Sequence, residues 1–197
     1  DRARAQFDSW SKTYDRSIVQ HLLFQPAYRM LLAELARWRA DDARPFDLLD
    51  IGCGTGSSLA MIAGSALNSN RLVGLDYSLS MCSVAHEKGQ VIGEGGPIIL
   101  NGDSEHLPFA DASFDAITCS NSFHHYPHQA DVIREMRRVL RPGGRLLLID
   151  GFRDNVIGWV LFDFFITRAE STPQAKVFHA PWSLIRQYFL DAGLRDV

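Results

Sequence analysis

The stretch Asp50-Ile51-Gly52-Cys53-Gly54-Thr55-Gly56-Ser57 decides the fold that this chain is expected to adopt. An apolar run that begins at Phe46 precedes it and the apolar residues 59–63 follow it, so the pattern predicts a buried strand, a glycine turn and a helix. Alternate glycines let backbone N–H groups approach a ligand closely, where a Cβ would clash. A phosphate group would gain nothing from the carboxylate of Asp50, whereas a cationic amine would, so this position favours a ligand that carries an amine.

The composition indicates one globular domain and excludes several classes of partner. Of the 197 residues, 46% are hydrophobic and 22% are charged, which fits a single substantial core. The net charge of −3 gives no general attraction to nucleic acid, so we expect no nucleic-acid partner. Three widely spaced cysteines indicate free thiols in a reducing compartment, which predicts a cytoplasmic location. We expect neither a membrane span nor a signal peptide, because no apolar run approaches the roughly 20 residues that cross a bilayer.

Strand-like and helix-like segments alternate through the middle of the chain, and this alternation predicts a mainly parallel sheet with helices on both faces. Arg141-Pro142-Gly143-Gly144 is expected to stop a helix and to turn into the fifth strand. The expected strands are Phe46–Ile51, Leu72–Asp76, Ile98–Leu100, Phe114–Cys119 and Arg145–Asp150, and the helices between them are Ser57–Ala66, Leu79–Lys88 and Gln129–Leu140.

The two ends of the chain are expected to be helical. Residues 1–45 are predicted to form an N-terminal helical lid, and residues 46–197 the main domain. Gly193 is expected as the residue that ends the last helix, and the few residues after it look like a strand that has barely begun, so we expect a truncation before the last strands. The expected helices of these end regions are Arg2–Trp10, Tyr28–Arg39, Asn155–Glu170 and Pro181–Ala192.

Acidic residues stand at the ends of the first three expected strands. Ligands of open parallel sheets bind beyond the carboxyl ends of the strands. At such a position Asp76 can accept hydrogen bonds from both hydroxyls of a ribose, and Asp103 can accept from an exocyclic amine such as that of adenine. Together with Asp50, these acids suit an adenosine without phosphates and suit a pyrophosphate badly.

The glycine spacing separates this turn from a dinucleotide-binding turn. The latter reads G-x-G-x-x-G, whereas Gly52, Gly54 and Gly56 give G-x-G-x-G, and Ser57 stands where the third dinucleotide glycine would be. A dinucleotide-dependent oxidoreductase is therefore disfavoured and is kept as an alternative.

The chain resembles the class I S-adenosylmethionine-dependent methyltransferases, in the small-molecule branch that includes ubiquinone and menaquinone methyltransferases. The resemblance implies an α/β three-layer Rossmann-like sandwich with an N-terminal helical lid. It also implies transfer of a methyl group from S-adenosyl-L-methionine to a small acceptor, with S-adenosyl-L-homocysteine as product. The resemblance rests on LLDIGCGTG (48–56), GLDYSLSMCSVA (74–85), NGDSEHLPFADASFDAITCS (101–120), MRRVLRPGGRLLLID (136–150) and FHAPWSLIRQYFLDAGLRDV (178–197).

The resemblance further implies roles for matching residues. Asp50 would hold the amino group of the cofactor, directly or through water, Asp76 the ribose, and Asp103 the adenine amino group. Asp50 could instead cap the helix that follows the glycine turn. Asp76 could cap the helix that begins near residue 79, although Ser78 is better placed for that role. Met81 could instead be an ordinary core residue. The residues implied to bind the cofactor are Asp50, Gly52, Cys53, Gly54, Gly56, Asp76, Tyr77, Met81, Asp103, Ser104, Ser120 and Asn121.

No strong catalytic constellation is required by this chemistry. The methyl group of a sulfonium is already electrophilic, and a base helps only where the acceptor carries a proton. His125 and Tyr14, the latter in the expected lid, are the candidates for orienting the acceptor or taking its proton. The clustered histidines after the fourth strand are poorly spaced for a metal, so no metal site is predicted. The arginines at positions 134, 137, 138 and 141 are interpreted as the solvated face of a helix.

The acceptor is only broadly indicated. The apolar segment 156–165 follows the fifth strand, where the family builds its substrate pocket, and it favours a hydrophobic acceptor; the alternative is that it packs a core or a homodimer interface. His124-His125 stands where quinone methyltransferases commonly carry Arg-Asn, so a quinone acceptor does not follow. An RNA or protein methyltransferase is disfavoured by the charge and by the lack of an acidic-Pro-Pro-aromatic motif, and a non-catalytic binding protein stays open.

Overall fold

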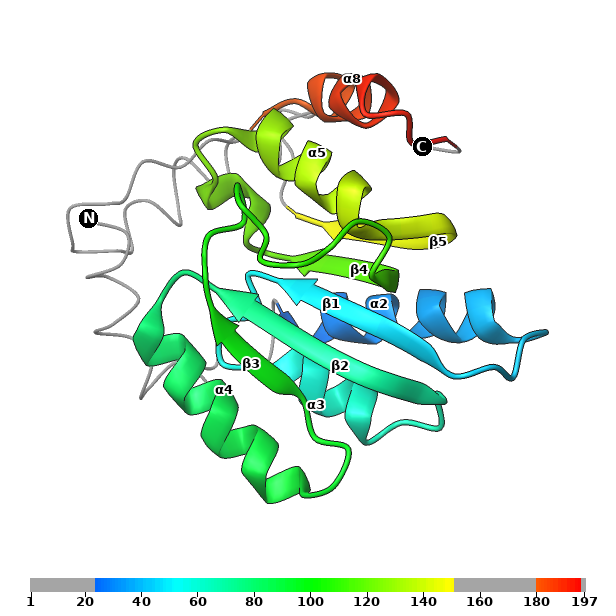
Figure 1. Cartoon of the computed structure of the whole chain (residues 1–197), viewed down its shortest axis with the longest axis vertical. Helices are drawn as coiled ribbons and strands as arrows, with labels where there is room; N and C mark the ends of the chain where they lie inside the picture. Colours follow the sequence, from blue (N-terminus) through cyan, green and yellow to red (C-terminus); the bar gives the residue numbers. More distant parts are fainter. Residues whose placement is uncertain (1–23, 151–179, 196–197) are drawn as a thin grey trace.

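A computed structural model describes residues 24–150 and 180–195 of the chain. Within them, five parallel strands form one sheet in the order β3-β2-β1-β4-β5 (Figure 1). The expected helices at 2–10 and 155–170, the apolar segment 156–165 and Tyr14 lie outside the described residues. The strands are β1 (Phe46–Ile51), β2 (Ser69–Asp76), β3 (Ile98–Asn101), β4 (Phe114–Ser120) and β5 (Leu140–Ile149).

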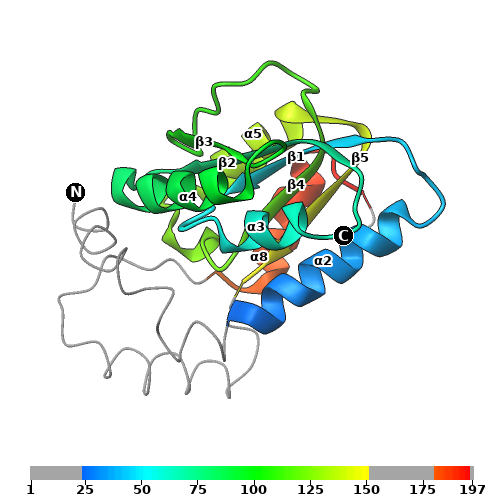
Figure 2. The same cartoon turned by 90° about the horizontal axis from the view of Figure 1, so that it is seen from below.

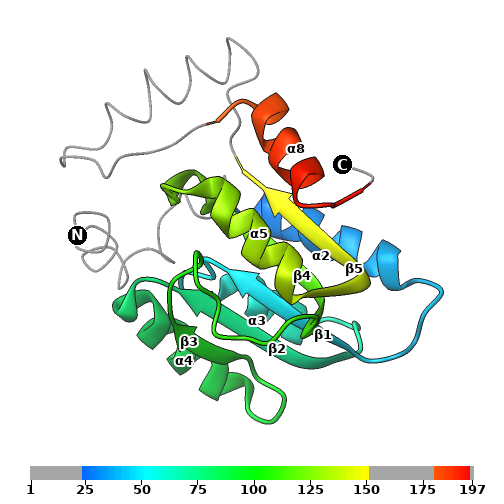
Figure 3. The same cartoon turned by 45° about the horizontal axis from the view of Figure 1, so that its top comes forward.

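Helices cover both faces of the sheet, as the alternation of the sequence predicts. On one face, α2 (Gln25–Arg39), α3 (Ser57–Ala63) and α4 (Leu79–Ile92) lie side by side (Figure 2). On the other face, α5 (Gln129–Val139) and α8 (Trp182–Asp191) pack against each other and lie over β4 and β5 (Figure 3). The three-layer α/β architecture is therefore confirmed.

The core consists of two apolar layers, because successive residues of a strand point to opposite faces of the sheet. In β1, Leu48 packs in the layer formed with α2 and α3, whereas its neighbour Leu49 packs in the layer formed with α5 and α8. Every residue of β1 is buried, including Asp47 and Asp50, so the central strand is covered on both faces. Burial on both faces fixes the position of the turn that follows this strand. No helix of the described residues is long and apolar enough to cross a bilayer.

Within residues 24–150 and 180–195, the predicted elements occur at the predicted places, and the differences lie at their ends. The largest concerns Arg141–Gly144, which we expected as a turn before β5. Leu140 already pairs with Phe114, and Arg145 pairs with Ala116, so the four residues form an irregularity inside the strand. Gly143 has a φ of 78°, which lets the chain bend there without leaving the sheet.

The end of α8 follows the prediction for Gly193. This glycine has a φ of 79°, its N–H donates to Leu190 O at 2.9 Å, and the N–H of Leu194 donates to Phe189 O at 2.9 Å. These two bonds form a Schellman motif, in which a left-handed glycine satisfies the last carbonyls of the helix.

The interpretation of the four arginines as a solvated helix face is wrong for two of them. Arg138 donates to the carbonyl oxygens of Phe109 at 2.7 Å and Leu107 at 3.0 Å, and it pairs with Glu135 at 2.7 Å. Arg141 pairs with Asp115 at 2.6 Å and with Asp47 at 3.1 Å. The planar guanidinium can serve several acceptors at once, so Arg138 fixes the loop between β3 and β4 onto α5.

We expect Arg138→Met to lower the free energy of unfolding by about 1–3 kcal/mol, because charge-assisted bonds to two buried-loop carbonyls are lost. The matched control is Arg134→Met on the same helix. The side chain of Arg134 is 66% exposed and forms a solvent-exposed ion pair with Asp131 of the same helix, so a change within about 0.5 kcal/mol is expected. Urea unfolding of both variants measures the difference, and equal effects would contradict the anchoring role of Arg138.

Candidate cofactor site at the carboxyl edge of the sheet

Since all five strands are parallel, their carboxyl ends meet at one edge, where the arrowheads of Figure 1 point. Asp76 and Ser120 are the last residues of β2 and β4. The glycine turn follows β1, Asp103 follows β3, and Asn121 follows β4. The topology therefore brings the predicted cofactor residues that surround these strand ends to one side of the molecule.

The three glycines of the turn all have left-handed backbones, with φ values of 69° at Gly52, 53° at Gly54 and 75° at Gly56. A Cβ on Gly52 would lie 2.3 Å from Ser122 Oγ and 2.6 Å from Tyr126 Oη. A Cβ on Gly56 would lie 3.1 Å from the Cβ of Ala85 in α4. Only beside Gly54 is the space open, with no atom within 4 Å, so Gly54 is the glycine whose bare backbone a ligand can approach.

Asp76 is bound to this turn. Its Oδ2 accepts the N–H of Gly54 and its Oδ1 accepts the N–H of Ser78, both at 2.8 Å. Burial raises the pKa of Asp76 above its ordinary value, and the two backbone hydrogen bonds act in the opposite direction. Each carboxylate oxygen has a second lone pair, so Asp76 can still accept from two ligand hydroxyls beside Gly54.

Asp50 lies behind the turn. It is 2% exposed, and its carboxylate accepts hydrogen bonds from Ser58 Oγ of α3 and, at 2.7 Å, from Thr118 Oγ1 of β4. Burial raises the pKa of Asp50 to about 6, against the effect of these two hydroxyls. The contacts differ from a helix cap, because the donors are side chains and not the backbone N–H groups of α3.

The remaining predicted cofactor residues differ in exposure. Tyr77 is 50% exposed beside Asp76, whereas Met81 is 2% exposed, as an ordinary core residue would be. The Asp103 side chain is 49% exposed and accepts the N–H of Glu105 at 2.9 Å. Cys53 and Ser104 are buried. Asn121 has a φ of 54° and donates its side-chain N–H to Ser120 Oγ at 3.0 Å.

Several polar residues that hold the site were not identified from the sequence. Thr118 of β4 lies opposite Asp50 of β1 in the strand register. The sequence feature that could have identified it is a polar side chain within a mostly apolar strand. Ser122 donates to Ile51 O at 3.2 Å and contacts Tyr126 Oη at 3.2 Å, so both fill the space under Gly52. Lys88 of α4 donates to Ser57 Oγ at 3.0 Å and holds the turn from outside.

The predicted histidines occupy different surroundings. His124 Nδ1 lies 2.6 Å from Oδ1 of Asp150, which directly follows β5. The ring of His125 lies 4.0 Å from that of His124, and His128 pairs with Glu105 at 2.8 Å. In the part of the chain that the structure describes, no group of three or more His, Cys, Asp or Glu is arranged to hold a metal ion.

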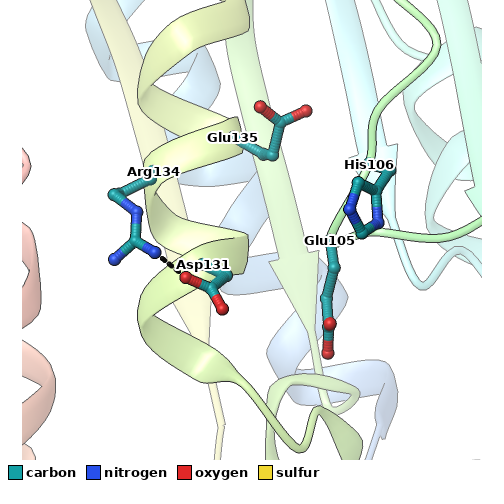
Figure 4. A pocket seen from close by; sticks show the side chains of 5 residues that line it. All are labelled: Glu105, His106, Asp131, Arg134 and Glu135. Atoms are coloured by element: carbon teal, nitrogen blue, oxygen red, sulfur yellow. Dashed lines mark ion pairs between the residues drawn. The ribbon is translucent and has the colours of Figure 1, made fainter.

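A hollow of about 250 Å³ lies between α5 and the loop after β3 (Figure 4). None of the predicted cofactor residues lines it. Its carboxylates already have partners, since Asp131 pairs with Arg134, Glu135 with Arg138 and Glu105 with His128. We therefore assign no ligand to it. The lining residues are Glu105, His106, Asp131, Arg134 and Glu135.

The burial of Asp50 makes the free energy of unfolding depend on pH. Because its folded pKa, about 6, exceeds the ordinary value of 3.8, the folded state binds the proton more tightly, and stability falls as the pH rises through this range. The matched variant Asp50→Asn stays neutral. We expect the wild-type protein to lose roughly 2–3 kcal/mol relative to this variant between pH 4 and pH 7, measured by denaturant unfolding. A difference that is independent of pH would contradict the raised pKa of the buried Asp50 carboxyl.

The different surroundings of the glycines predict different effects of alanine. Gly54→Ala is expected to cost about 1–2 kcal/mol of unfolding free energy, from the left-handed backbone alone. Gly52→Ala adds a clash with Ser122 and Tyr126 and should cost a further 1–3 kcal/mol or so. Thermal or urea unfolding of the two variants distinguishes them, and a greater loss for Gly54→Ala would contradict the assignment of open space beside Gly54.

Comparisons with known proteins agree with this geometry. The chain is 30% identical over 167 residues to a demethylmenaquinone methyltransferase of Listeria welshimeri. This alignment covers 81% of this chain and 66% of that protein. It therefore spans slightly less than two thirds of the length of that relative.

Solved structures with the same fold include the YcgJ protein of Bacillus subtilis, with 27% identity, a TM-score of 0.68 and coverage of 82% of this chain and 66% of that one. The [4+2]-cyclase SpnF, at 24% identity and a TM-score of 0.68 over 86% of this chain and 57% of its own, shares the fold alone. The family model described as "Methyltransferase domain" matches residues 49–148. The chain thus belongs to the methyltransferase domain family of class I S-adenosylmethionine-dependent methyltransferases.

Proposed function

We propose that this protein transfers the methyl group of S-adenosyl-L-methionine to a small organic acceptor and releases S-adenosyl-L-homocysteine. One observation carries the proposal: the carboxylate of Asp76 lies 2.8 Å from the N–H of Gly54, beside the open space of the turn. An acid that is bound to a bare backbone turn suits a ribose with free hydroxyls. It does not suit a phosphate, which the same charge would repel.

The other groups at this edge fit the rest of the cofactor. Asp103 follows the edge strand β3 and is half exposed, so its second oxygen is accessible to an adenine amino group. Asp50 brings a negative charge under the turn, where it favours the ammonium group of the methionine part, through water or across the backbone. Ser120 and Asn121 at the end of β4 are assigned to the same end of the cofactor.

The cofactor, when bound, supplies an electrophilic methyl group on a sulfonium. The protein then has to hold the two reactants in line and exclude water. The first task falls to Asp76 and the glycine turn, which are joined by the hydrogen bond from the N–H of Gly54 before any ligand arrives. Preformed contacts of this kind reduce the entropy that binding costs.

The acceptor and the setting belong to the proposal as well. We propose a small acceptor without nucleic acid, in keeping with the net charge of −3. The name of the Listeria relative, demethylmenaquinone methyltransferase, supports an acceptor with a hydrophobic ring. A cytoplasmic location is supported by the three cysteines, all of which are buried free thiols. The homodimer remains a prediction that a measurement of mass in solution would test.

Two alternatives are distinguished by binding and by turnover. A dinucleotide oxidoreductase would bind NAD, whereas we expect calorimetry to detect S-adenosylmethionine and S-adenosylhomocysteine and no NAD. A non-catalytic binding protein would bind the first two without transferring a methyl group. SpnF, which has this fold and is named a cyclase, makes the second measurement necessary.

Asp76→Ala is expected to weaken the binding of S-adenosylhomocysteine by about 1–3 kcal/mol, which is about 5- to 150-fold in Kd, because charge-assisted hydrogen bonds are lost. The control is Asp47→Asn. Asp47 is a buried carboxylate at the opposite, amino end of β1, where it pairs with Arg141, so its loss should affect stability but not affinity. Calorimetry measures the affinity of both folded variants for S-adenosylhomocysteine. Unchanged affinity in Asp76→Ala would remove the proposed orientation of the cofactor.

A further inference from the structure

A histidine and a buried carboxylate form a close pair at the carboxyl ends of β4 and β5. His124 lies in the short helix η3 (Phe123–His125), and Asp150 directly follows β5. Oδ1 of Asp150 is 2.6 Å from Nδ1 of His124, and Oδ2 accepts the backbone N–H of His124 at 2.9 Å. The Asp150 side chain is 2% exposed and that of His124 is 19% exposed, so solvent screens this pair only weakly.

This geometry fixes the state of the imidazole ring. A carboxylate only accepts hydrogen bonds, so Nδ1 of His124 carries a hydrogen and the lone pair of the neutral ring lies on Nε2. The same carboxylate stabilises the ring once Nε2 takes up a proton. His128 and Glu105 form a second pair of similar length, 2.8 Å, but the side chain of His128 is 63% exposed. The two pairs are thus matched in chemistry and differ in burial.

The position of the pair places it on the acceptor side of the proposed cofactor. Asp76 and Asp103, which are assigned to the adenosine, lie at the ends of β2 and β3, on one side of β1. The ends of β4 and β5 lie on the other side of β1. Ser122, two residues before His124, packs under Gly52, so the segment with the histidine is in contact with the turn.

We propose that His124, oriented by Asp150, is the general base of the methyl transfer and that the acceptor therefore carries an O–H group, as a phenol, an enol or an alcohol does. This inference rests on the proposed function. The sequence indicated His125 for such a role, but the contact with Asp150 is made by His124. His125 lies beside it, with ring centroids 4.0 Å apart.

The proposed step moves one proton to His124 and one methyl group to the acceptor. The O–H bond of the acceptor breaks and its proton passes to Nε2 of His124, while the oxygen, or a carbon conjugated with it, forms a bond to the methyl group. The bond between sulfur and methyl breaks, and its electron pair stays on sulfur, which becomes neutral. The imidazolium is held by Asp150 until the proton leaves to water.

A hydroxyl acceptor explains why a base is built into this edge. A hydroxyl is a weak nucleophile until its proton is removed, so a positioned base accelerates its reaction by about 10²- to 10⁴-fold. A neutral amine attacks through its lone pair and sheds its proton afterwards, so it needs no base in the transition state.

The first test concerns the ring itself and does not need turnover. ¹⁵N NMR of the full-length protein with labelled histidine should show His124 as the Nδ1–H tautomer, and Asp150→Asn should change that tautomer, because the amide can donate to the ring. An Nε2–H tautomer of His124 in the wild-type protein overturns the proposal.

The second test uses two naphthalene probes of different acidity. We expect methyl transfer to 1-naphthol, which is neutral at pH 7, to fall by about 10²-fold or more in His124→Asn and Asp150→Asn. Transfer to 2-hydroxy-1,4-naphthoquinone, which is already ionised at pH 7, should fall by less than about tenfold. His128→Asn, which disrupts the exposed pair, should leave both rates unchanged. Equal losses with both probes indicate a merely structural role and overturn the proposal, as does wild-type protein that methylates neither probe.

Calorimetry separates this outcome from a failure of the proposed function. If wild-type protein does not bind S-adenosylmethionine, the proposed function fails. If it binds and His124→Asn binds equally well but shows wild-type transfer to 1-naphthol, only the role of His124 fails. Circular dichroism of each variant verifies that it is folded before either comparison is made.

Discussion

The site depends on two carboxylates, Asp76 and Asp50, that are buried beside the glycine turn and at the end of the strand that leads into it. Asp76, at the end of β2, accepts a hydrogen bond from the N–H of Gly54, and Asp50, near the end of β1, accepts hydrogen bonds from the hydroxyls of Ser58 and Thr118. Burial of a carboxylate costs free energy unless hydrogen bonds compensate for the lost water. Here the donors come from the turn, from α3 and from β4, so these hydrogen bonds also connect the three elements that surround the candidate site.

Much of the fold followed from hydrophobic periodicity and from punctuation by glycine and proline. The five strands and the helices between them lie where the pattern predicts them, because strands and helices alternate and because glycine or proline flanks even the short elements α3 and β3. The irregular start of β5 was missed. Pro142, Gly143 and Gly144 look the same in a sequence whether the chain leaves the sheet or bends within it, and only the pairing of Leu140 with Phe114 distinguishes the two cases.

The side chains that support the site were less predictable than the strand ends. Asp50, Asp76 and Asp103 could be recognised because their positions relative to strands are set by local sequence. Thr118 and Asp150 act on residues far away in the chain, Asp50 and His124, and such partners depend on strand order. The arginines show the same limit, since a cation on a helix is usually solvated, and nothing local distinguishes Arg138 from Arg134.

The packing under Gly52 joins the two halves of the site mechanically. Ser122 and Tyr126 occupy the volume that a side chain at Gly52 would need, and they belong to the same segment as His124. With the proposed assignment of the two sites, affinity for the methyl donor and preference for the methyl acceptor depend on the same packing. Under that proposal, substitutions in residues 121–126 that admit a new acceptor would also change the packing beneath the glycine turn, so the two specificities would evolve together.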